Sequence, residues 1–168
     1  FLYNQDGYDI LILPEDELAK FVIDRIIQNE RLYEGKLIHI LPCGDWRNTI
    51  RLHRDILESN MTNHSTKVIS VLDGDVTDRF ENEKRKDKAL GRLNVAFLPI
   101  PSLEKYLHKY LVENVDSSFF RDVNDRFFRK KSLDEVVAEY QEAGLDGKGK
   151  RLWTRMVTSL GDEGLTEN

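Results

Sequence analysis

Four short runs of aliphatic residues are the feature that most limits what this chain can fold into. Each run is rich in Val, Ile or Leu and lacks the clean polar–apolar alternation of a strand with one exposed face. Continuous apolar strands are typical of a parallel sheet that helices cover on both faces. The runs span residues 9–13, 37–41, 68–72 and 95–98. We therefore expect a central, mostly parallel sheet of four strands.

The segments between these runs have the spacing of helices. From Glu17 to Glu30, apolar residues recur three and four positions apart, and residues 50–57 carry a weaker stripe of the same kind. Residues 78–88 are almost wholly charged, which is compatible with a solvated helix or a loop. The alternation of strand and helix predicts an α/β, Rossmann-like domain with right-handed crossovers.

Beyond the fourth run, the sequence predicts helices and no further strand. Helical patterns lie at residues 103–111, 117–129, 132–143 and 150–160. We expect residues 1–115 to form the core and residues 116–168 to form a C-terminal helical extension of the same domain.

Composition limits the partners and the compartment of the protein. No apolar run approaches the about 20 residues that a membrane-spanning helix needs, so we expect no membrane partner. The formal net charge is -5, so any contact with nucleic acid depends on local basic patches or on bound cations. The single cysteine, Cys43, cannot form an internal disulfide, which favours a reducing compartment, here the cytoplasm.

Acidic residues follow the expected strands. Glu15 comes after the first strand, Asp45 after the second, Asp73 and Asp75 after the third, and Glu104 after the fourth. Because the carboxyl ends of parallel strands meet at one edge of a sheet, these carboxylates would repel one another unless a counter-charge lies between them. Mg²⁺ or Mn²⁺ prefers such oxygen ligands and retains waters for substrate phosphate. Capping of the following helices is an alternative role for each carboxylate.

Gly74 separates the two aspartates that follow the third strand. A glycine permits a tight turn there, so that Asp73 and Asp75 can both face one ion. Among the histidines, His39 lies in the middle of the second strand, and we expect it to be buried and hydrogen-bonded. We expect Cys43 to be a small packing residue.

This order of residues resembles the Toprim fold, which topoisomerases, primases and certain nucleases share. The pattern is a glutamate after the first strand, a glycine after the second and Asp-x-Asp after the third. Three further segments resemble blocks of the OLD (overcoming lysogenization defect) family of ATP-dependent endonucleases. They are the helix start at residues 13–20, the Ser-x-Glu block at residues 101–107 and the Gly-Lys block at residues 149–152.

The resemblance implies a DNA endonuclease or nickase that hydrolyses phosphodiester bonds with two Mg²⁺ or Mn²⁺ ions. By this resemblance, Glu15 binds one metal or acts in acid–base chemistry, and Asp73, Asp75 and Glu104 are further metal ligands. Lys150 would stabilise the charge that develops on the phosphate.

Two features leave the ligand set and the lysine open. Many members of the family carry a further acidic residue at the position of Ala19, so Asp16 or Glu17 would have to substitute for it. Lys148 lies close enough in the sequence to compete with Lys150 for the catalytic role.

Two basic clusters are candidates for contact with DNA. The first spans residues 84–88, and the second is favoured because Phe127 and Phe128 accompany it. Both are interleaved with Asp and Glu and are compatible with ordinary solvated faces. The residues of the second cluster are Arg126, Arg129, Lys130 and Lys131, with Lys148 as a further candidate.

The chain has no Gly-x-x-x-x-Gly-Lys-[Ser/Thr] phosphate loop, so any use of ATP requires another domain. The resemblance implies such an N-terminal ATPase domain, a homo-oligomeric parent protein and a role in defence against phage. We accordingly expect this chain, which starts at Phe1, to be part of a longer protein.

Other readings of the same residues remain open. Residues 73–77 match the Asp-x-Asp-x-Thr box of haloacid-dehalogenase-like phosphohydrolases, with Asp73 as nucleophile, although that box normally follows the first strand of its domain. A receiver-like signalling module would use Glu15 and Asp16 as an acidic pair and Asp73 as phosphoacceptor, but it needs a lysine at the end of a later strand. If the carboxylates do not converge, an interaction module remains.

Overall fold

The computed structural model describes residues 7–115, 117–144 and 150–162, which belong to two compact units. The first unit ends at Pro101 and the second begins at Ser102. The expected core extends to residue 115, so the boundary between the units lies earlier than the boundary that the sequence suggests. The helix at residues 103–111 belongs to the second unit.

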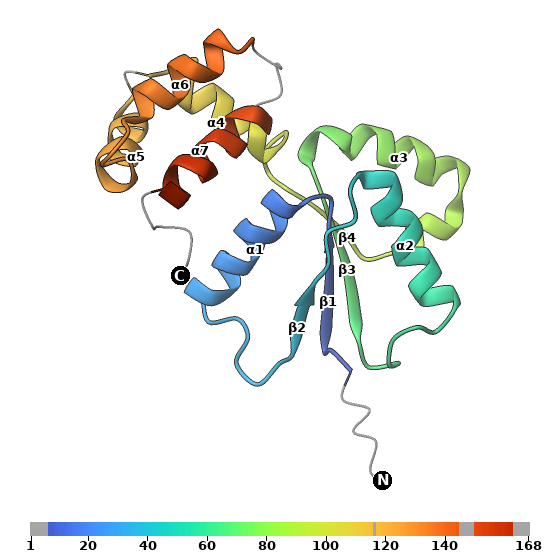
Figure 1. Cartoon of the computed structure of the whole chain (residues 1–168). Helices are drawn as coiled ribbons and strands as arrows, with labels where there is room; N and C mark the ends of the chain where they lie inside the picture. Colours follow the sequence, from blue (N-terminus) through green and yellow to red (C-terminus); the bar gives the residue numbers. More distant parts are fainter. Residues whose placement is uncertain (1–6, 116, 145–149, 163–168) are drawn as a thin grey trace. The chain divides into compact units, whose positions relative to one another are not determined.

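The first unit contains a sheet of four parallel strands, as predicted (Figure 1). The strands lie in the order β2-β1-β3-β4, so β1 and β3 are central and β2 and β4 form the edges. Their bounds are β1 (Ile10–Pro14), β2 (Ile38–Ile40), β3 (Lys67–Leu72) and β4 (Val95–Phe97). With the helices around it, this sheet makes the fold α/β and Rossmann-like.

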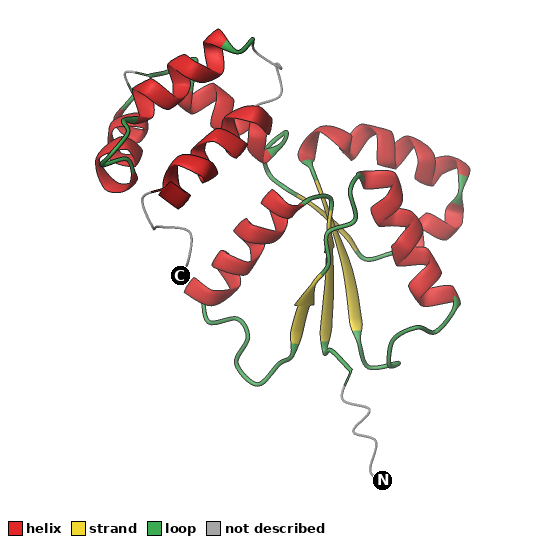
Figure 2. Cartoon of the chain, viewed as in Figure 1, coloured by secondary structure: helices red, strands yellow, loops and turns green. Residues whose placement is uncertain are grey.

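Helices cover both faces of this sheet (Figure 2). Helix α1 (Glu17–Asn29) lies on one face, and α2 (Trp46–Glu58) and α3 (Thr77–Lys86) lie on the other. The chain runs from β1 outward to β2 and then returns past β1 to β3 and β4. With right-handed crossovers, this reversal requires the helix before β2 and the helices after it to lie on opposite faces. Most of the charged segment at residues 78–88 is helical, because it lies within α3. Two short 3₁₀ turns, η1 (Gly74–Val76) and η2 (Lys88–Arg92), flank α3.

The core of the first unit lies between the sheet and the pair α2 and α3. One buried cluster joins Leu11 and Leu13 of β1 and Val68 of β3 to Ile56 of α2. A second cluster extends it under α3 and consists of Ile50, Leu72, Val76, Phe80 and Leu90. Burial of this aliphatic surface fixes which way each strand faces and therefore where each strand ends.

The buried histidine of this core is His53, not His39. His53 of α2 is 1% exposed, and its Nδ1 shares a 2.8 Å hydrogen bond with Oγ of Ser70 on β3. His39 is half-buried and stacks on the ring of Tyr8, and its ring makes no hydrogen bond within the described part of the chain. The expectation for His39 is wrong because β2 is an edge strand, where a side chain is only partly covered.

The second unit is helical and has its own core. It contains α4 (Leu103–Leu111), α5 (Ser118–Phe127), α6 (Leu133–Glu142) and α7 (Lys150–Asp162), close to the predicted ranges. Serines precede α4, α5 and α6, and each hydroxyl accepts a hydrogen bond from a backbone N–H of the first turn. The buried side chains include Leu111, Leu133, Val136, Tyr140 and Leu152.

None of the helices in the described ranges combines the length and the apolar character that crossing a bilayer requires.

Burial of His53 makes the stability of the first unit depend on pH. Burial lowers the pKa of this imidazole to about 4 from an ordinary 6.5. The unfolded chain therefore takes up a proton at a higher pH than the folded chain does. We expect the free energy of unfolding to fall by about 3 kcal/mol from this group as the pH drops from above 6.5 to below 4. Urea denaturation across this interval measures the loss.

The variant His53→Gln should lose that part of the pH dependence, whereas His64→Gln, at an exposed position, should retain it. An unchanged pH slope in His53→Gln would show that the imidazole is not buried in its neutral form.

Candidate functional site

The strand order reverses between β1 and β3, so the carboxyl ends of these two strands form the topological switch point of the sheet. In open parallel sheets, ligands bind at such a topological switch point because the flanking loops diverge there. Glu15 follows β1 and Asp73 follows β3. Oε1 of Glu15 accepts a 2.8 Å hydrogen bond from the backbone N–H of Asp73. The structure therefore joins two residues that the sequence predicts to share a site, although they are 58 positions apart.

Negative charge accumulates around the Glu15 carboxyl group. Its pKa is raised, chiefly by burial, and the nearby charges of Asp16, Asp75 and Asp45 raise it further. The hydrogen bond from the N–H of Asp73 opposes this shift. Within the described residues, the charged side chains that act on Glu15 are thus all aspartates. Acidic residues that follow β1, β2 and β3 therefore act electrostatically on Glu15, and their sharing of one metal site stays a prediction.

Two of these aspartates also cap helices. Oδ1 of Asp16 accepts a 2.9 Å hydrogen bond from the N–H of Ala19 at the start of α1. Oδ1 of Asp45 accepts hydrogen bonds from the N–H groups of Arg47 and Asn48 at the start of α2. The capping role and the electrostatic role are therefore combined in the same side chains. Asp73 differs, because its side chain does not cap η1.

Gly74 holds the loop after β3 against the segment after β4. Its N–H donates to the carbonyl oxygen of Ile100, and the N–H of Asp75 donates to that of Pro101, both at 3.0 Å. A Cβ atom on Gly74 would lie 2.5 Å from the oxygen of Ile100 and 2.7 Å from that of Leu98. The glycine is needed for this close approach of two backbones, rather than only for the tight turn that the sequence suggests. This contact fixes the position of Asp73 and Asp75.

The other predicted residues of the metal and catalytic site lie in the second unit or outside the described residues. Glu104 is in the first turn of α4 and is 6% exposed. Lys150 is the first residue of α7, and Lys148 lies outside the described residues. Their participation with Glu15 and Asp73 in one site stays a prediction.

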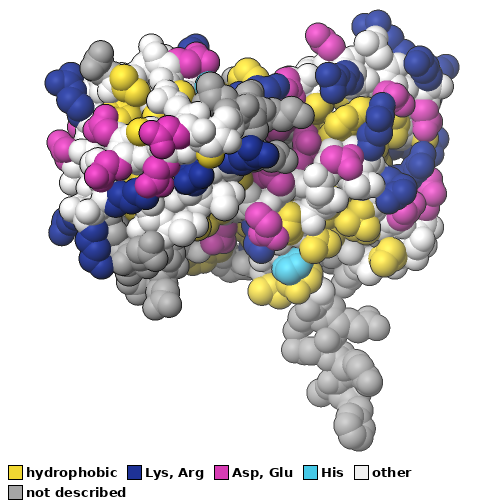
Figure 3. Space-filling model, turned by 45° about the horizontal axis from the view of Figure 1, so that its top comes forward, with side chains coloured by type: hydrophobic (Ala, Val, Ile, Leu, Met, Phe, Trp, Pro, Cys, Tyr) yellow, Lys and Arg dark blue, Asp and Glu magenta, His cyan; other side chains and the backbone are white. Residues whose placement is uncertain are grey.

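The basic cluster proposed to contact DNA is partly used in ion pairs. Nζ of Lys131 lies 2.6 Å from Oε1 of Glu139, and Arg155 contacts the other oxygen of this carboxylate. The hydrogen bond from Lys131 lowers the pKa of Glu139. Over the face that Figure 3 shows, Lys and Arg side chains are interspersed with Asp and Glu. Arg126, Arg129 and Lys130 are exposed, and their contact with DNA stays a prediction.

The donor chemistry of the acidic edge suits a hard divalent cation, because it offers oxygen ligands and excess negative charge. In the described ranges, however, no three Asp, Glu, His or Cys side chains are arranged to hold one metal ion. Glu15 is instead bonded to the backbone of Asp73. A cation at this edge therefore requires rotation of side chains or ligands from water and substrate.

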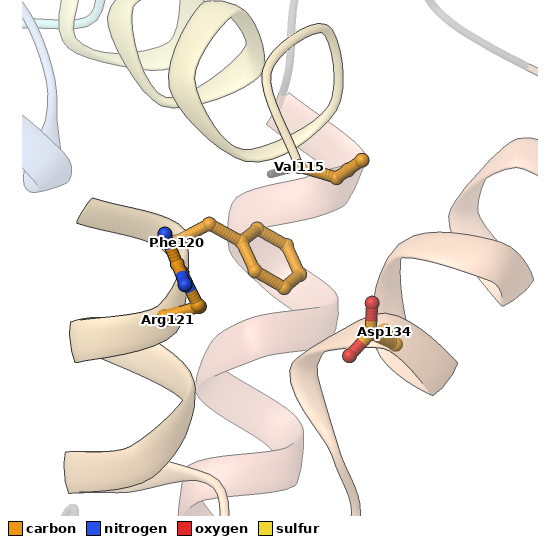
Figure 4. Close-up of a pocket in the computed structure, with 4 residues that line it drawn as sticks. All are labelled: Val115, Phe120, Arg121 and Asp134. Atoms are coloured by element: carbon orange, nitrogen blue, oxygen red, sulfur yellow. The ribbon is translucent and has the colours of Figure 1, made fainter. Parts of the chain in front are cut away.

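A pocket of about 410 Å³ lies in the second unit (Figure 4). Val115, Phe120, Arg121 and Asp134 line it, and the Phe120 ring lies between Arg121 and Asp134. Among the residues whose side chains the structure describes, none of the predicted metal or catalytic set lines this pocket.

Comparisons of the chain with protein-family models, with curated proteins and with solved structures find no match.

The ionised Glu15 carboxylate should lower the free energy of unfolding, because burial and the neighbouring aspartates disfavour its charge in the native state. Because its pKa is raised above the ordinary 4.5, folding opposes ionisation of this group, and stability falls as the pH rises through the folded-state pKa. Glu15→Gln removes the charge but keeps an oxygen that can accept from the N–H of Asp73. We expect this variant to be more stable than the wild type near pH 8 and equally stable near pH 4. Urea denaturation at both pH values measures the difference.

Glu34→Gln, in an exposed turn, is the matched control and should behave like the wild type at both pH values. A Glu15→Gln protein that is less stable than the wild type near pH 8 would mean that the carboxylate is compensated in the native state.

Proposed function

We propose that the first unit is the catalytic part of a metal-dependent DNA endonuclease or nickase that resembles the Toprim unit of the OLD family. The observation that carries this proposal is the hydrogen bond between the Glu15 carboxylate and the N–H of Asp73 at the switch point of the sheet. The negative charge that Asp16, Asp45 and Asp75 add there gives a reason for cation binding.

When bound, Mg²⁺ or Mn²⁺ would supply Lewis acidity for hydrolysis of the phosphodiester by water. Asp73 and Asp75 hold a metal from the loop after β3, whose position Gly74 fixes. Glu104 is a further ligand, and Lys150 neutralises charge on the phosphate.

Glu15 has two roles in this chemistry. As a metal ligand, the Glu15 carboxylate would be stabilised by the bound cation, which offsets the repulsion from the neighbouring aspartates. As an acid–base group, it benefits from its raised pKa, because a more basic carboxylate accepts a proton more readily. The 2.8 Å bond to Asp73 keeps its carboxylate at the end of β3 in either role.

The wider setting of the proposal depends on the family resemblance. It comprises DNA as substrate, an N-terminal ATPase domain through which ATP acts, a homo-oligomeric parent protein, cytoplasmic location and defence against phage.

Cleavage of supercoiled plasmid DNA in the presence of Mg²⁺ or Mn²⁺ tests this function. Because Asp73 and Glu15 are proposed to hold the metal, Asp73→Ala and Glu15→Gln should each lower the cleavage rate at least about 100-fold. Mn²⁺ should also raise the melting temperature of the wild type in a concentration-dependent way, and much less that of Asp73→Ala.

Glu34→Gln should cleave and bind Mn²⁺ like the wild type, because its side chain is exposed in the turn before β2. Absence of cleavage by the wild type with either metal, or full activity of Asp73→Ala, would contradict the nuclease proposal.

A receiver-like signalling module is the second candidate, because of the strand order. The order β2-β1-β3-β4 equals the first four positions of the flavodoxin-like order 2-1-3-4-5, in which Asp73 would be the phosphoacceptor after β3. Asp16, which this reading requires in the acidic pair, is used as the cap of α1. Binding of beryllofluoride at Asp73 together with failure of plasmid cleavage would favour the receiver. The phosphohydrolase reading is less supported, because Asp73 follows β3, the third strand of the chain, whereas that box normally follows the first strand of its domain.

A further inference from the structure

A second pocket, of about 440 Å³, lies in the first unit between the segment after β2 and helix α2. One wall is the segment that follows β2 and includes Leu41 and Pro42. Helix α2 forms the rest of the lining with Leu52 and the polar residues Asn48, Arg51 and Asp55. Cys43 and Leu52 also pack against the buried cluster of Leu11, Leu13, Ile56 and Val68, so part of the pocket lining belongs to the hydrophobic core. This agrees with the expectation that Cys43 is a packing residue.

The polar residues of this pocket lie on one face of α2. Asn48, Arg51 and Asp55 are spaced three and four positions apart, which places them along one line of the helix. The pocket therefore combines an apolar surface, a cation, an amide and one carboxylate. This is the composition expected of a site for a small polar ligand with a flat apolar part.

A chain of hydrogen bonds orients the cation of the pocket. Nη2 of Arg51 donates to Oδ1 of Asn48 at 3.0 Å, and Nδ2 of Asn48 donates to Oδ2 of Asp45 at 2.7 Å. Asp45 is itself held by the backbone N–H groups at the start of α2. Within the described part of the chain, the Arg51 guanidinium makes no ion pair; its contact is with a neutral amide. Its charge is thus held in place and is not neutralised by a carboxylate contact.

The same hydrogen-bond chain connects the pocket to the acidic edge. Asp45 is one of the aspartates whose charge acts on Glu15. Arg51 follows it by six positions on the helix that Asp45 caps. For a strand of nucleic acid with one phosphate at Glu15 and Asp73, Asp45 and Asn48 mark a route along α2 from that phosphate to Arg51.

We propose that the pocket is a subsite for one unpaired nucleotide next to the phosphate that is cleaved. Arg51 contacts the phosphate of this nucleotide, a role for which a planar guanidinium is well suited. The base lies against Leu41, Pro42 and Leu52, and Asn48 and Asp55 are within the same pocket to accept or donate hydrogen bonds at its edge. The inference depends on the proposed nuclease function and adds a substrate class to it.

The requirement for an unpaired nucleotide follows from the apolar part of the pocket lining. A base can contact the apolar surface of a pocket only when it leaves the stack of a duplex. The substrate of this edge is therefore single-stranded DNA or a single-stranded flap or frayed end, rather than an intact duplex.

Fluorescence anisotropy with two labelled probes tests the subsite. The probes are a single-stranded oligothymidylate of about twelve nucleotides and the same strand in a duplex. Ca²⁺ replaces Mg²⁺ so that binding is measured without cleavage. We expect the single strand to bind at least about tenfold more tightly than the duplex. Arg51→Gln should weaken binding of the single strand about tenfold and reduce its salt dependence by about one phosphate contact.

Two further variants separate a local effect from a general one. Leu41→Ser, at a side chain that is 40% exposed, should weaken binding of the single strand without unfolding the protein. Arg54→Gln lies on the same helix but pairs with Asp87 outside the pocket, and it should bind like the wild type. Circular dichroism of each variant verifies folding.

The outcomes distinguish the subsite from the nuclease function. If Arg51→Gln binds the single strand like the wild type, or the duplex binds more tightly, the subsite is contradicted, while metal-dependent cleavage that is lost in Asp73→Ala still supports the nuclease. If the protein neither binds the probes nor cleaves DNA, both proposals fail.

Discussion

The hydrogen bond between the Glu15 carboxylate and the backbone of Asp73 is the interaction on which the account of this protein depends. It connects the ends of β1 and β3, the two central strands, at the point where the order of the strands in the sheet reverses. It also holds a partly buried carboxylate in a region to which Asp16, Asp45 and Asp75 add negative charge. A fold that keeps an unfavourable charge in a fixed place gains little stability from it, and such places are often functional.

The strands were predictable because each is a continuous run of aliphatic residues, which a parallel sheet with two covered faces requires. The start of α2 was not predicted. The sequence nevertheless contains a signal for it, because Asp45 immediately precedes the helix and caps it. His53 and Gly74 show why the rest could not be read from the chain. The partner of His53 is Ser70, and the contact of Gly74 is the backbone of Ile100. Such long-range pairs exist only after the strands have been placed.

The candidate site could be predicted in part for the same reason. A parallel sheet places the ends of β1 and β3 at one edge, and the strand order makes these two strands neighbours, which allows Glu15 and Asp73 to meet. Arg51 and Asn48 were missed because an exposed arginine on a helix has no distinctive spacing of its own. The signal that could have revealed them is their position in the first two turns of a helix capped by Asp45, one of the predicted acidic groups.

The direct test of the account is the ionisation of Glu15 itself, followed by the carbon-13 shift of its carboxyl group in an NMR titration with and without Mg²⁺. Without the cation, the account predicts a titration midpoint above the ordinary pKa of 4.5, because burial and the surrounding aspartates raise the pKa. With saturating Mg²⁺, it predicts a midpoint below that value, because a bound cation stabilises the carboxylate. A Glu15 pKa that is ordinary without Mg²⁺, or that stays raised when Mg²⁺ is added, would contradict the claim that this edge of the sheet is built to hold a cation.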